Sequence, residues 1–151
     1  MDKDAFKRLA RSLNIPTLPH MVVTARDWTQ DREATLDEIA AFATRESDGG
    51  ALIGKPIAHG SSIGMRIART AGEWPAAVDE ALRYGEGAML EPYLERAREL
   101  EVAVLERRDG SVESFGPGEV FPGHEFYDYE AKYAPGVSRT VTESDLPAAV
   151  R

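Results

Sequence analysis

The sequence predicts an α+β fold, in which helices alternate with strands that pair antiparallel. Three segments carry apolar residues at helical spacing, and five shorter segments are apolar or alternate between apolar and polar residues. The dipeptide Asp109-Gly110 follows one alternating segment, and such a pair is a strong signal for a hairpin turn. Because a hairpin joins antiparallel neighbours, we expect the sheet to be antiparallel.

The three helices are expected at residues 2–14, 35–47 and 73–84. Asp2 can cap the first helix, and Pro16 stops it because proline disfavours helix at the preceding residue. The pattern Thr35-x-x-Glu38 is a capping box, so it should begin the second helix. In the third helix, apolar side chains recur at helical spacing from Trp74 to Leu82.

The strands are expected at residues 20–24, 51–55, 63–68, 88–90 and 101–106. Each is short and bounded by glycine, proline or polar residues. Residues 116–136 are rich in glycine and proline, with aromatic residues among acids, and we expect them to form either a long ordered loop or no ordered loop at all. Loops of that length are commonly functional or disordered.

Composition excludes several classes of protein. The chain has 151 residues, which suits one domain, and a formal net charge of −8 argues against partners such as nucleic acid or an acidic membrane. It has no cysteine, so disulfides and cysteine-bound zinc are excluded and cytoplasmic residence is expected. No apolar run reaches the ~20 residues of a membrane span, and the charged start does not resemble a signal peptide.

The stretch LIGKPIAHGSSIGM at residues 52–65 points most directly to a ligand. Glycines let a backbone approach closely, and serine hydroxyls and exposed N–H groups can donate to oxyanions. Lys55 would add an ammonium group, which gains on the order of 4 kcal/mol at about 4 Å from a phosphate if the effective dielectric is about 20, before desolvation. The stretch is neither a P-loop nor a G-x-G-x-x-G fingerprint. It predicts a phosphate site, and the alternative is a plain hairpin loop beside a surface lysine.

Two other stretches hold candidate binding residues. HEFYDYEAKY at residues 124–133 has no helical or strand period, so Lys132 is a candidate second phosphate ligand on a loop. The alternative is a surface strand with solvated charges. In residues 89–106, Glu91 follows one strand and Glu99 precedes another, where a carboxylate can accept from ribose hydroxyls. The alternative for both glutamates is simple solvation.

The histidines are scattered and do not predict a metal site. His20, His59 and His124 show no spacing typical of metal ligands. His59 lies beside the glycine-serine loop, where contact with phosphate is one interpretation and simple exposure is the other.

Five motifs occur in one order along the chain: MDK at 1–3, NIPT at 14–17, KPIAHGSSIGM at 55–65, LEPYL with RELEVAVLE within 90–106, and GEVFPGHEFYDYEAKY at 118–133. In this order they resemble the D-alanine–D-alanine ligases, members of the ATP-grasp superfamily. The FYDYEAKY motif is highly specific, and the KP…GSS.G motif is moderately specific. The resemblance covers nearly all of this chain but only the central part of the family's sequence.

The resemblance implies a fold and a division into domains. Residues 1–100 would form an ATP-grasp-type nucleotide-binding subdomain, the lid, which has an antiparallel sheet, flanking helices and a leading helix. Residues 101–151 would begin the sheet of the C-terminal subdomain, include its mobile loop, and be truncated.

The resemblance also implies which residues contact ATP. In such ligases the lysine of the MDK segment and the lysine before the glycine loop contact the nucleotide, here Lys3 and Lys55. The GSS.G loop folds over the triphosphate, which implicates Ser61, Ser62 and Gly64.

The remaining site residues follow from three other motifs. The E-x-x-L segment lines the adenine pocket, here Glu91, Tyr93 and Leu94, and the glutamate of the RE pair holds ribose, here Glu99. The lysine of YEAKY reaches the terminal phosphate from a mobile loop, here Lys132. The neighbouring Tyr133 resembles the residue that latches this loop against Ser61, so Ser61, Lys132 and Tyr133 are the implied catalytic residues.

The chain departs from the family pattern at three places. Gly54 stands where a β-branched residue is usual, and His59 stands where glutamate is common. The LERARE segment is longer than the usual turn, which puts the place of Glu99 in question.

The resemblance implies ATP-dependent ligation of a carboxylate to an amine through an acyl phosphate, serving peptidoglycan precursor synthesis. The family's N-terminal domain and its C-terminal segment with acidic Mg²⁺ ligands have no counterpart here. We therefore expect the chain alone to be inactive, to use D-alanine only if those parts are supplied, and to lack the ligands for Mg²⁺. The alternatives are a non-catalytic nucleotide-binding fragment, or part of another ATP-grasp carboxylate–amine ligase. Exposed strand edges further predict self-association, or disorder in residues 116–151.

Overall fold

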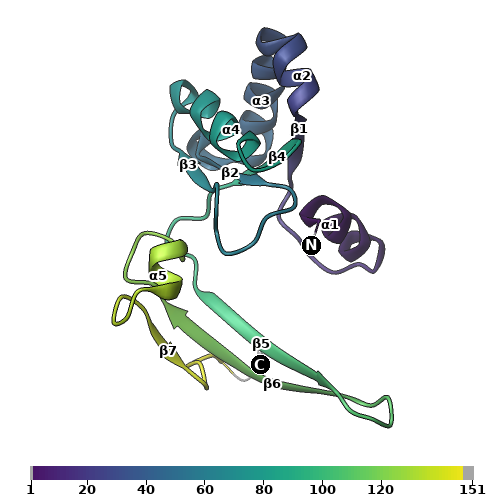
Figure 1. Cartoon of the computed structure of the whole chain (residues 1–151), viewed down its shortest axis with the longest axis vertical. Coiled ribbons are helices and arrows are strands. Elements are labelled where there is room, and N and C mark those ends of the chain that lie inside the picture. Colours follow the sequence, from purple (N-terminus) through teal and green to yellow (C-terminus); the bar gives the residue numbers. More distant parts are fainter. Residues whose placement is uncertain (1, 148–151) are drawn as a thin grey trace. The chain divides into compact units, whose positions relative to one another are not determined.

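The chain forms two units that divide between Leu94 and Glu95 in the computed structural model, which describes residues 2–147 (Figure 1). Both units combine helix with antiparallel sheet, so the α+β class is confirmed. The sequence placed the boundary after residue 100. The interpretation of the two parts as a lid and the start of a C-terminal subdomain stays a prediction.

The first unit is built on a four-stranded sheet in the order β1-β4-β2-β3, with every neighbouring pair antiparallel. Its strands are β1 (Met21–Thr24), β2 (Leu52–Pro56), β3 (Arg66–Ala68) and β4 (Gly87–Pro92). Its helices are α1 (Lys3–Ser12), α2 (Ala25–Gln30), α3 (Arg32–Glu46) and α4 (Trp74–Leu82), with short 3₁₀ helices η1 (Asp48–Gly50) and η2 (Ala71–Glu73). Figure 1 shows α3 and α4 on one side of this sheet and α1 on the other.

The core of the first unit lies between the sheet and the pair α3 and α4. Side chains alternate between the faces of a strand, so Leu52 of β2 and Ala88 and Leu90 of β4 point to these helices. They pack with apolar residues of the helices, among them Ile39, Phe42, Trp74, Val78 and Ala81. The opposite face of β2 and β4 is thereby left to Ile53, Lys55, Met89 and Glu91.

Gly54 permits close packing of α4 on β2. A Cβ atom at this position would lie 2.8 Å from the backbone oxygen of Ala77, closer than real Cβ contacts allow. The departure from a β-branched residue therefore has a structural reason, because any side chain here would push the helix away from the strand.

Helix α1 is attached to the first unit mainly by polar groups. Asp2 caps it by accepting from the N–H of Ala5 at 2.9 Å, as predicted. The N–H of Lys3 donates to the carbonyl of Ile57 at 3.0 Å, and Ala10 is the buried residue of the helix. Its large apolar residues Phe6, Leu9 and Leu13 are exposed.

The predicted start of the second helix is wrong. Helix α3 begins at Arg32, and its N-cap is Asp31, whose carboxylate accepts from the N–H of Ala34 at 3.0 Å. Thr35 is a buried interior residue, and its hydroxyl donates to the carbonyl of Asp31 at 2.7 Å. The six-residue helix α2 was not predicted.

The second unit has a three-stranded antiparallel sheet in the order β5-β6-β7. Its strands are β5 (Glu99–Glu106), β6 (Val112–Phe121) and β7 (Arg139–Val141), and a short helix α5 (Tyr129–Tyr133) lies between β6 and β7 in sequence. The turn at Asp109-Gly110 is confirmed, with the N–H of Gly110 donating to the carbonyl of Arg107 at 2.9 Å. The single long loop predicted for 116–136 is wrong, because residues 116–121 belong to β6.

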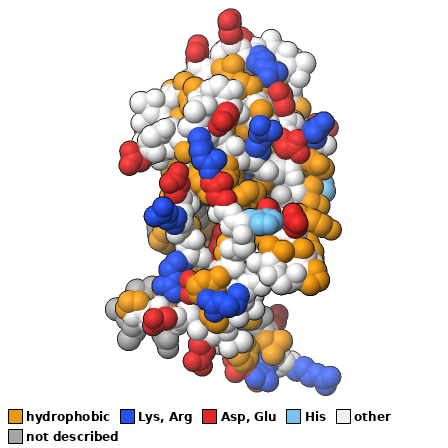
Figure 2. Space-filling model, turned by 90° about the vertical axis from the view of Figure 1, so that its left-hand side faces the viewer, with side chains coloured by type: hydrophobic (Ala, Val, Ile, Leu, Met, Phe, Trp, Pro, Cys, Tyr) orange, Lys and Arg blue, Asp and Glu red, His pale blue; other side chains and the backbone are white. Residues whose placement is uncertain are grey.

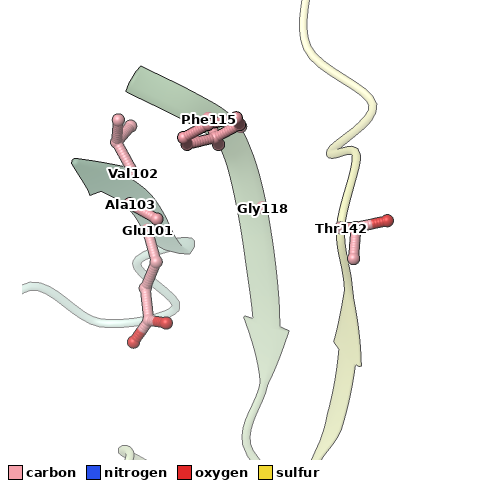
Figure 3. Close-up of a pocket in the computed structure, with 7 residues that line it drawn as sticks. Glu101, Val102, Ala103, Phe115, Gly118 and Thr142 are labelled. Carbon is pink, nitrogen blue, oxygen red and sulfur yellow. The ribbon is translucent and has the colours of Figure 1, made fainter. Parts of the chain in front are cut away.

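The hairpin of β5 and β6 exposes apolar side chains. Val102, Val104 and Val112 are 57%, 65% and 67% exposed. A hollow of about 510 Å³ lies beside an irregular step in the hairpin, lined by β5, β6 and Thr142 (Figure 3). On the face drawn in Figure 2, acidic and basic side chains are interspersed with exposed apolar ones.

Candidate functional site

Lys55 and Glu91 meet on the face of the first sheet that is turned away from α3 and α4. Lys55 of β2 lies opposite Met89 of β4, and Ile53 lies opposite Glu91, so Lys55 and Glu91 are diagonal neighbours. The Nζ atom of Lys55 lies 2.5 Å from Oε2 of Glu91. Glu91 is only 3% exposed, so the alternative of simple solvation does not hold for this residue.

Lys7 supplies a second cation to the same carboxylate. Its Nζ pairs with Oε1 of Glu91 and also donates to the backbone carbonyl of Leu18 at 2.9 Å. Each carboxylate oxygen therefore faces a different lysine, one from α1 and one from β2. The side chains of Lys7 and Lys55 are 12% and 21% exposed.

The two lysines keep Glu91 ionised in spite of its burial. Burial alone would raise the pKa of the Glu91 carboxyl, because removal from water disfavours the charged form. The charges and hydrogen bonds of Lys55 and Lys7 outweigh that effect, and the pKa lies below its ordinary value. Glu91, Lys7 and Lys55 interact strongly because they are largely buried, so replacement of one of these groups should change how firmly the other two are held.

Lys3 reaches the beginning of the glycine-serine loop. Its ammonium group donates to the carbonyl of Pro56 at 2.7 Å and also to the carbonyl of His59. Pro56 is the last residue of β2 and directly follows Lys55. The ring of His59 meets the ring of Tyr84 edge-on, with centroids 5.7 Å apart.

The glycine-serine loop holds two serines in the left-handed region. Ser61 and Ser62 have φ of 52° and 58°, and Gly64 has φ of 70°. A non-glycine residue in this region costs on the order of 1–3 kcal/mol, and such strain gathers at ligand-binding segments. Backbone bonds from Ile63 to Gly60 at 3.1 Å and from Met65 to Ser62 at 3.4 Å close the turns. Gly60 to Gly64 is thus a loop of consecutive turns, and Lys3 contacts the residue that precedes it.

Tyr93 and Leu94 continue from the end of β4. The N–H of Tyr93 donates to the carbonyl of Ala51 at 3.0 Å, which fixes the backbone just after Glu91. The guanidinium of Arg69 lies 5.8 Å from the centre of the Tyr93 ring. Leu94 is 52% exposed. These contacts place Tyr93 just past the end of β4, in the sheet that also carries Lys55 and Glu91.

The other three predicted residues belong to the second unit. Glu99 is the first residue of β5, where it pairs with Val120. Lys132 and Tyr133 end α5, whose N-cap Asp128 accepts from the N–H of Ala131 at 2.7 Å. The ammonium of Lys132 lies 5.1 Å from the centre of the Tyr127 ring, and the rings of Tyr129 and Tyr133 lie 4.8 Å apart.

The site in the first unit suits an anion with several oxygens. Ammonium groups at the end of a strand supply positive charge, and a glycine-serine loop supplies hydroxyl and N–H donors. The Glu91 carboxylate fixes the position of the Lys55 ammonium group through their ion pair. A phosphate chain has the charge and the acceptor oxygens that such groups bind.

The described residues hold no cluster of three or more candidate metal ligands. Within residues 2–147, no group of three His, Cys, Asp or Glu side chains is arranged to hold a metal ion. Glu91, the buried acid of the site, is engaged by two lysines. Magnesium prefers carboxylates that are not neutralised in this way.

Within residues 2–147, the helices are too short or too polar to cross a bilayer.

Sequence reasoning missed Lys7. Lys3 and Lys7 are four residues apart, so they lie on one face of α1. That spacing was the available signal, but it does not reveal which side of the sheet the helix covers. The stacking of Arg69 on Tyr93 was missed for the same reason, because it depends on tertiary packing.

The sequence matches the protein family described as D-ala D-ala ligase C-terminus over residues 9–151. The D-alanine–D-alanine ligase of Heliobacterium modesticaldum is 38% identical over 149 residues, which are 99% of this chain and 38% of that protein. The D-alanine–D-alanine ligase of Methylobacterium sp. strain 4-46 is 37% identical over 98% of this chain and 37% of that protein. The chain therefore spans a little over a third of the length of these relatives.

Solved structures give the same picture of the fold. The crystal structure of D-alanyl-alanine synthetase A from Vibrio cholerae has a TM-score of 0.76 at 29% identity and matches 98% of this chain and 42% of that chain. The VanG D-Ala:D-Ser ligase from Enterococcus faecalis has a TM-score of 0.76 over 99% of this chain and 40% of that chain. At 23% identity, the second similarity shows the fold alone.

Proposed function

Because the chain belongs to the D-alanine–D-alanine ligase C-terminus family, we propose that it is the ATP-binding portion of an enzyme that joins two D-alanine molecules. The observation that carries the proposal is the presence of two lysines near the end of β2. Lys3 donates to the carbonyl of Pro56, Lys55 directly precedes Pro56 in β2, and a loop with two left-handed serines follows. Ammonium groups and a glycine-serine loop can both donate hydrogen bonds to the oxygens of a polyphosphate. The similarity of the chain to D-alanine–D-alanine ligases also supports the proposal.

We assign the following roles to the residues. Lys3 and Lys55 would bind phosphate oxygens, and Ser61, Ser62 and Gly64 would fold over the triphosphate. The adenosine part would lie along the end of β4, at the residues Glu91, Tyr93 and Leu94, with Glu99 at the ribose. Lys132 would reach the terminal phosphate, and Tyr133 would latch its segment against Ser61.

The proposed reaction has two steps. The terminal phosphoryl group of ATP is transferred to the carboxylate of one D-alanine, which gives an acyl phosphate and ADP. The amine of the second D-alanine then attacks the acyl carbon, forms the amide and releases inorganic phosphate and a proton. The residues of this chain would hold the phosphates and offset their charge. We place this reaction in the cytoplasm, in the synthesis of peptidoglycan precursors.

The chain by itself is expected to bind ATP without turning it over. It spans 37–38% of these relatives, and we expect the magnesium ligands to come from elsewhere in the whole protein. Titration with a fluorescent ATP analogue, with and without Mg²⁺, tests binding. A coupled phosphate assay with D-alanine tests turnover, with a full-length relative as the positive control. No saturable binding would refute the proposed function, and D-alanine-dependent phosphate release would refute the inactivity.

A further inference from the structure

We propose that Lys7 is a positioning residue of the nucleotide site, which remains as the counter-ion of Glu91 when Lys55 turns to a phosphate group. The inference rests on the proposed function, because it assumes that Lys55 binds phosphate. Lys7 lies between the MDK motif at 1–3 and the NIPT motif at 14–17 and belongs to neither. It contacts Glu91 and the backbone of Leu18, and we do not assign it a contact with the nucleotide.

The two lysines differ in how firmly they are held. Lys7 is fixed by two partners, the Glu91 carboxylate and the Leu18 carbonyl, and only 12% of its side chain is exposed. Lys55 pairs with the same carboxylate, is more exposed at 21%, and stands at the end of β2 where the glycine-serine loop begins. Lys55 is therefore the member of the cluster that can exchange its partner.

The exchange depends on a carboxylate that stays paired. Glu91 is 3% exposed, and a buried carboxylate without a cation is strongly unfavourable. With Lys7 in place, Lys55 can leave for phosphate while Glu91 keeps one ammonium partner. Without Lys7, the departure of Lys55 would leave the carboxylate unpaired, so Lys55 would stay on Glu91 or Glu91 would take up a proton.

Replacement of Lys7 by methionine should therefore weaken ATP binding in a pH-dependent way. Near neutral pH, the dissociation constant of a non-hydrolysable ATP analogue should rise on the order of tenfold or more, because Lys55 is retained by Glu91. The Glu91 carboxyl should have a higher pKa in this variant than in wild type, because one of its two cations is lost. As the pH falls through that pKa, Glu91 should become neutral and release Lys55. The dissociation constant of the variant, divided by that of wild type at the same pH, should then fall back toward one. A purely structural role for Lys7 would not produce this recovery.

Two other variants are matched controls. Arg8→Met removes one positive charge from the same helix at a side chain that is 74% exposed, and it should leave the affinity within about twofold of wild type. Lys7→Arg keeps the charge and should retain most of the binding. In a double-mutant cycle, Lys7→Met should have little further effect in a Glu91→Gln background, because the charge that it balances is already absent.

A measurement on the wild type covers the case in which Lys7→Met does not fold. The side-chain carboxyl of Glu91 can be followed by ¹³C NMR with the ATP analogue bound. We expect its pKa to rise when the analogue binds, because Lys55 is the larger cause of the lowering and turns to phosphate, while Lys7 keeps the carboxyl ionised near neutral pH. An unchanged pKa, or a carboxyl that is protonated near neutral pH in the complex, would overturn the inference. If wild type binds the analogue but Lys7→Met matches Arg8→Met at every pH, the inference fails and the proposed function stands. If wild type does not bind, the proposed function fails first.

Discussion

The ammonium of Lys55 lies 2.5 Å from the carboxylate of Glu91, a residue that is 3% exposed. The pair joins β2 to β4 on the face of the sheet that is turned away from its main helices. Any anion that binds Lys55 must compete with this carboxylate. The affinity of the site for phosphate therefore depends on the strength of the ion pair between Lys55 and Glu91 as well as on the contacts that the phosphate makes.

Replacement of Lys55 by alanine should weaken nucleotide binding. A hydrogen bond to a charged group contributes roughly 1.5–3 kcal/mol, so the dissociation constant should increase about 10- to 100-fold. Titration with a fluorescent ATP analogue measures this. Arg83→Ala is the control, since its side chain is 73% exposed and pairs with Glu80 on the surface of α4. Equal affinities for Lys55→Ala and wild type would show that the phosphate site lies elsewhere.

Replacement of Gly54 by alanine should destabilise the first unit. The new Cβ would lie 2.8 Å from the backbone oxygen of Ala77, so β2 and α4 must move apart. The free energy of unfolding should fall by roughly 1–3 kcal/mol, as for other overpacked sites. Urea denaturation measures this loss. Gly85→Ala is the control, because its Cβ would meet nothing within 4 Å, and a similar loss in both variants would contradict the explanation.

The stability of the second unit should depend on pH through His124. The hydrogen bond from His124 to Asp128, 2.8 Å long, is the main cause that raises the pKa of the imidazole in the folded state. The stabilisation is therefore complete below the unfolded pKa and is lost as the pH rises through the higher folded value. The difference in unfolding free energy between wild type and His124→Asn should be larger at about pH 5.5 than at about pH 8.5.

The control for this pH effect is Asp128→Asn. Asparagine can still cap α5, as Asp128 does through the N–H of Ala131, but it carries no charge for the imidazolium. The pH-dependent part of the difference should disappear in this background. An NMR titration that finds an ordinary or lowered pKa for His124 would rule out the proposed coupling.

The hairpin of the second unit should cause self-association. Val104 is 65% exposed on β5, which is an edge strand of its sheet. Light scattering should show a mass that increases with concentration, and Val104→Lys should weaken the association about tenfold or more, since burial of a valine contributes roughly 1.5–3 kcal/mol. Ser114→Lys is the control, because Ser114 pairs with Val104 across the hairpin but is already polar. A wild-type monomer at every concentration would contradict this prediction.

Local patterns predicted much of the fold. Asp2 caps α1 as expected, and the strands of the first sheet lie near the predicted segments, because apolar period and turn residues act over a few residues. The start of α3 was misplaced because Thr35 fits a capping box, while Asp31 also has the chemistry of an N-cap. Only the burial of Thr35 decides between them, and burial is a tertiary property.

The glycines and the proline of β6 led to the wrong prediction that residues 116–121 lie in a loop. Gly118 was interpreted as part of a loop, but its backbone lies so close to β7 that a Cβ would be 2.9 Å from the carbonyl of Val141. Glycine here marks close approach of two strands. The partners of Glu91 could not be predicted either, because Lys7 and Lys55 are brought together by the docking of α1, which no local pattern specifies.

The attachment of α1 differs in kind from that of the rest of the first unit. Phe6, Leu9 and Leu13 are exposed, and the helix is held instead by its charged residues, Lys3 at two carbonyls and Lys7 at Glu91. Ionic strength weakens such attractions where water reaches them, but the pair of Lys7 and Glu91 is largely buried and is therefore screened little. Salt should leave this helix in place, whereas loss of the Glu91 charge should loosen it and expose it to proteases.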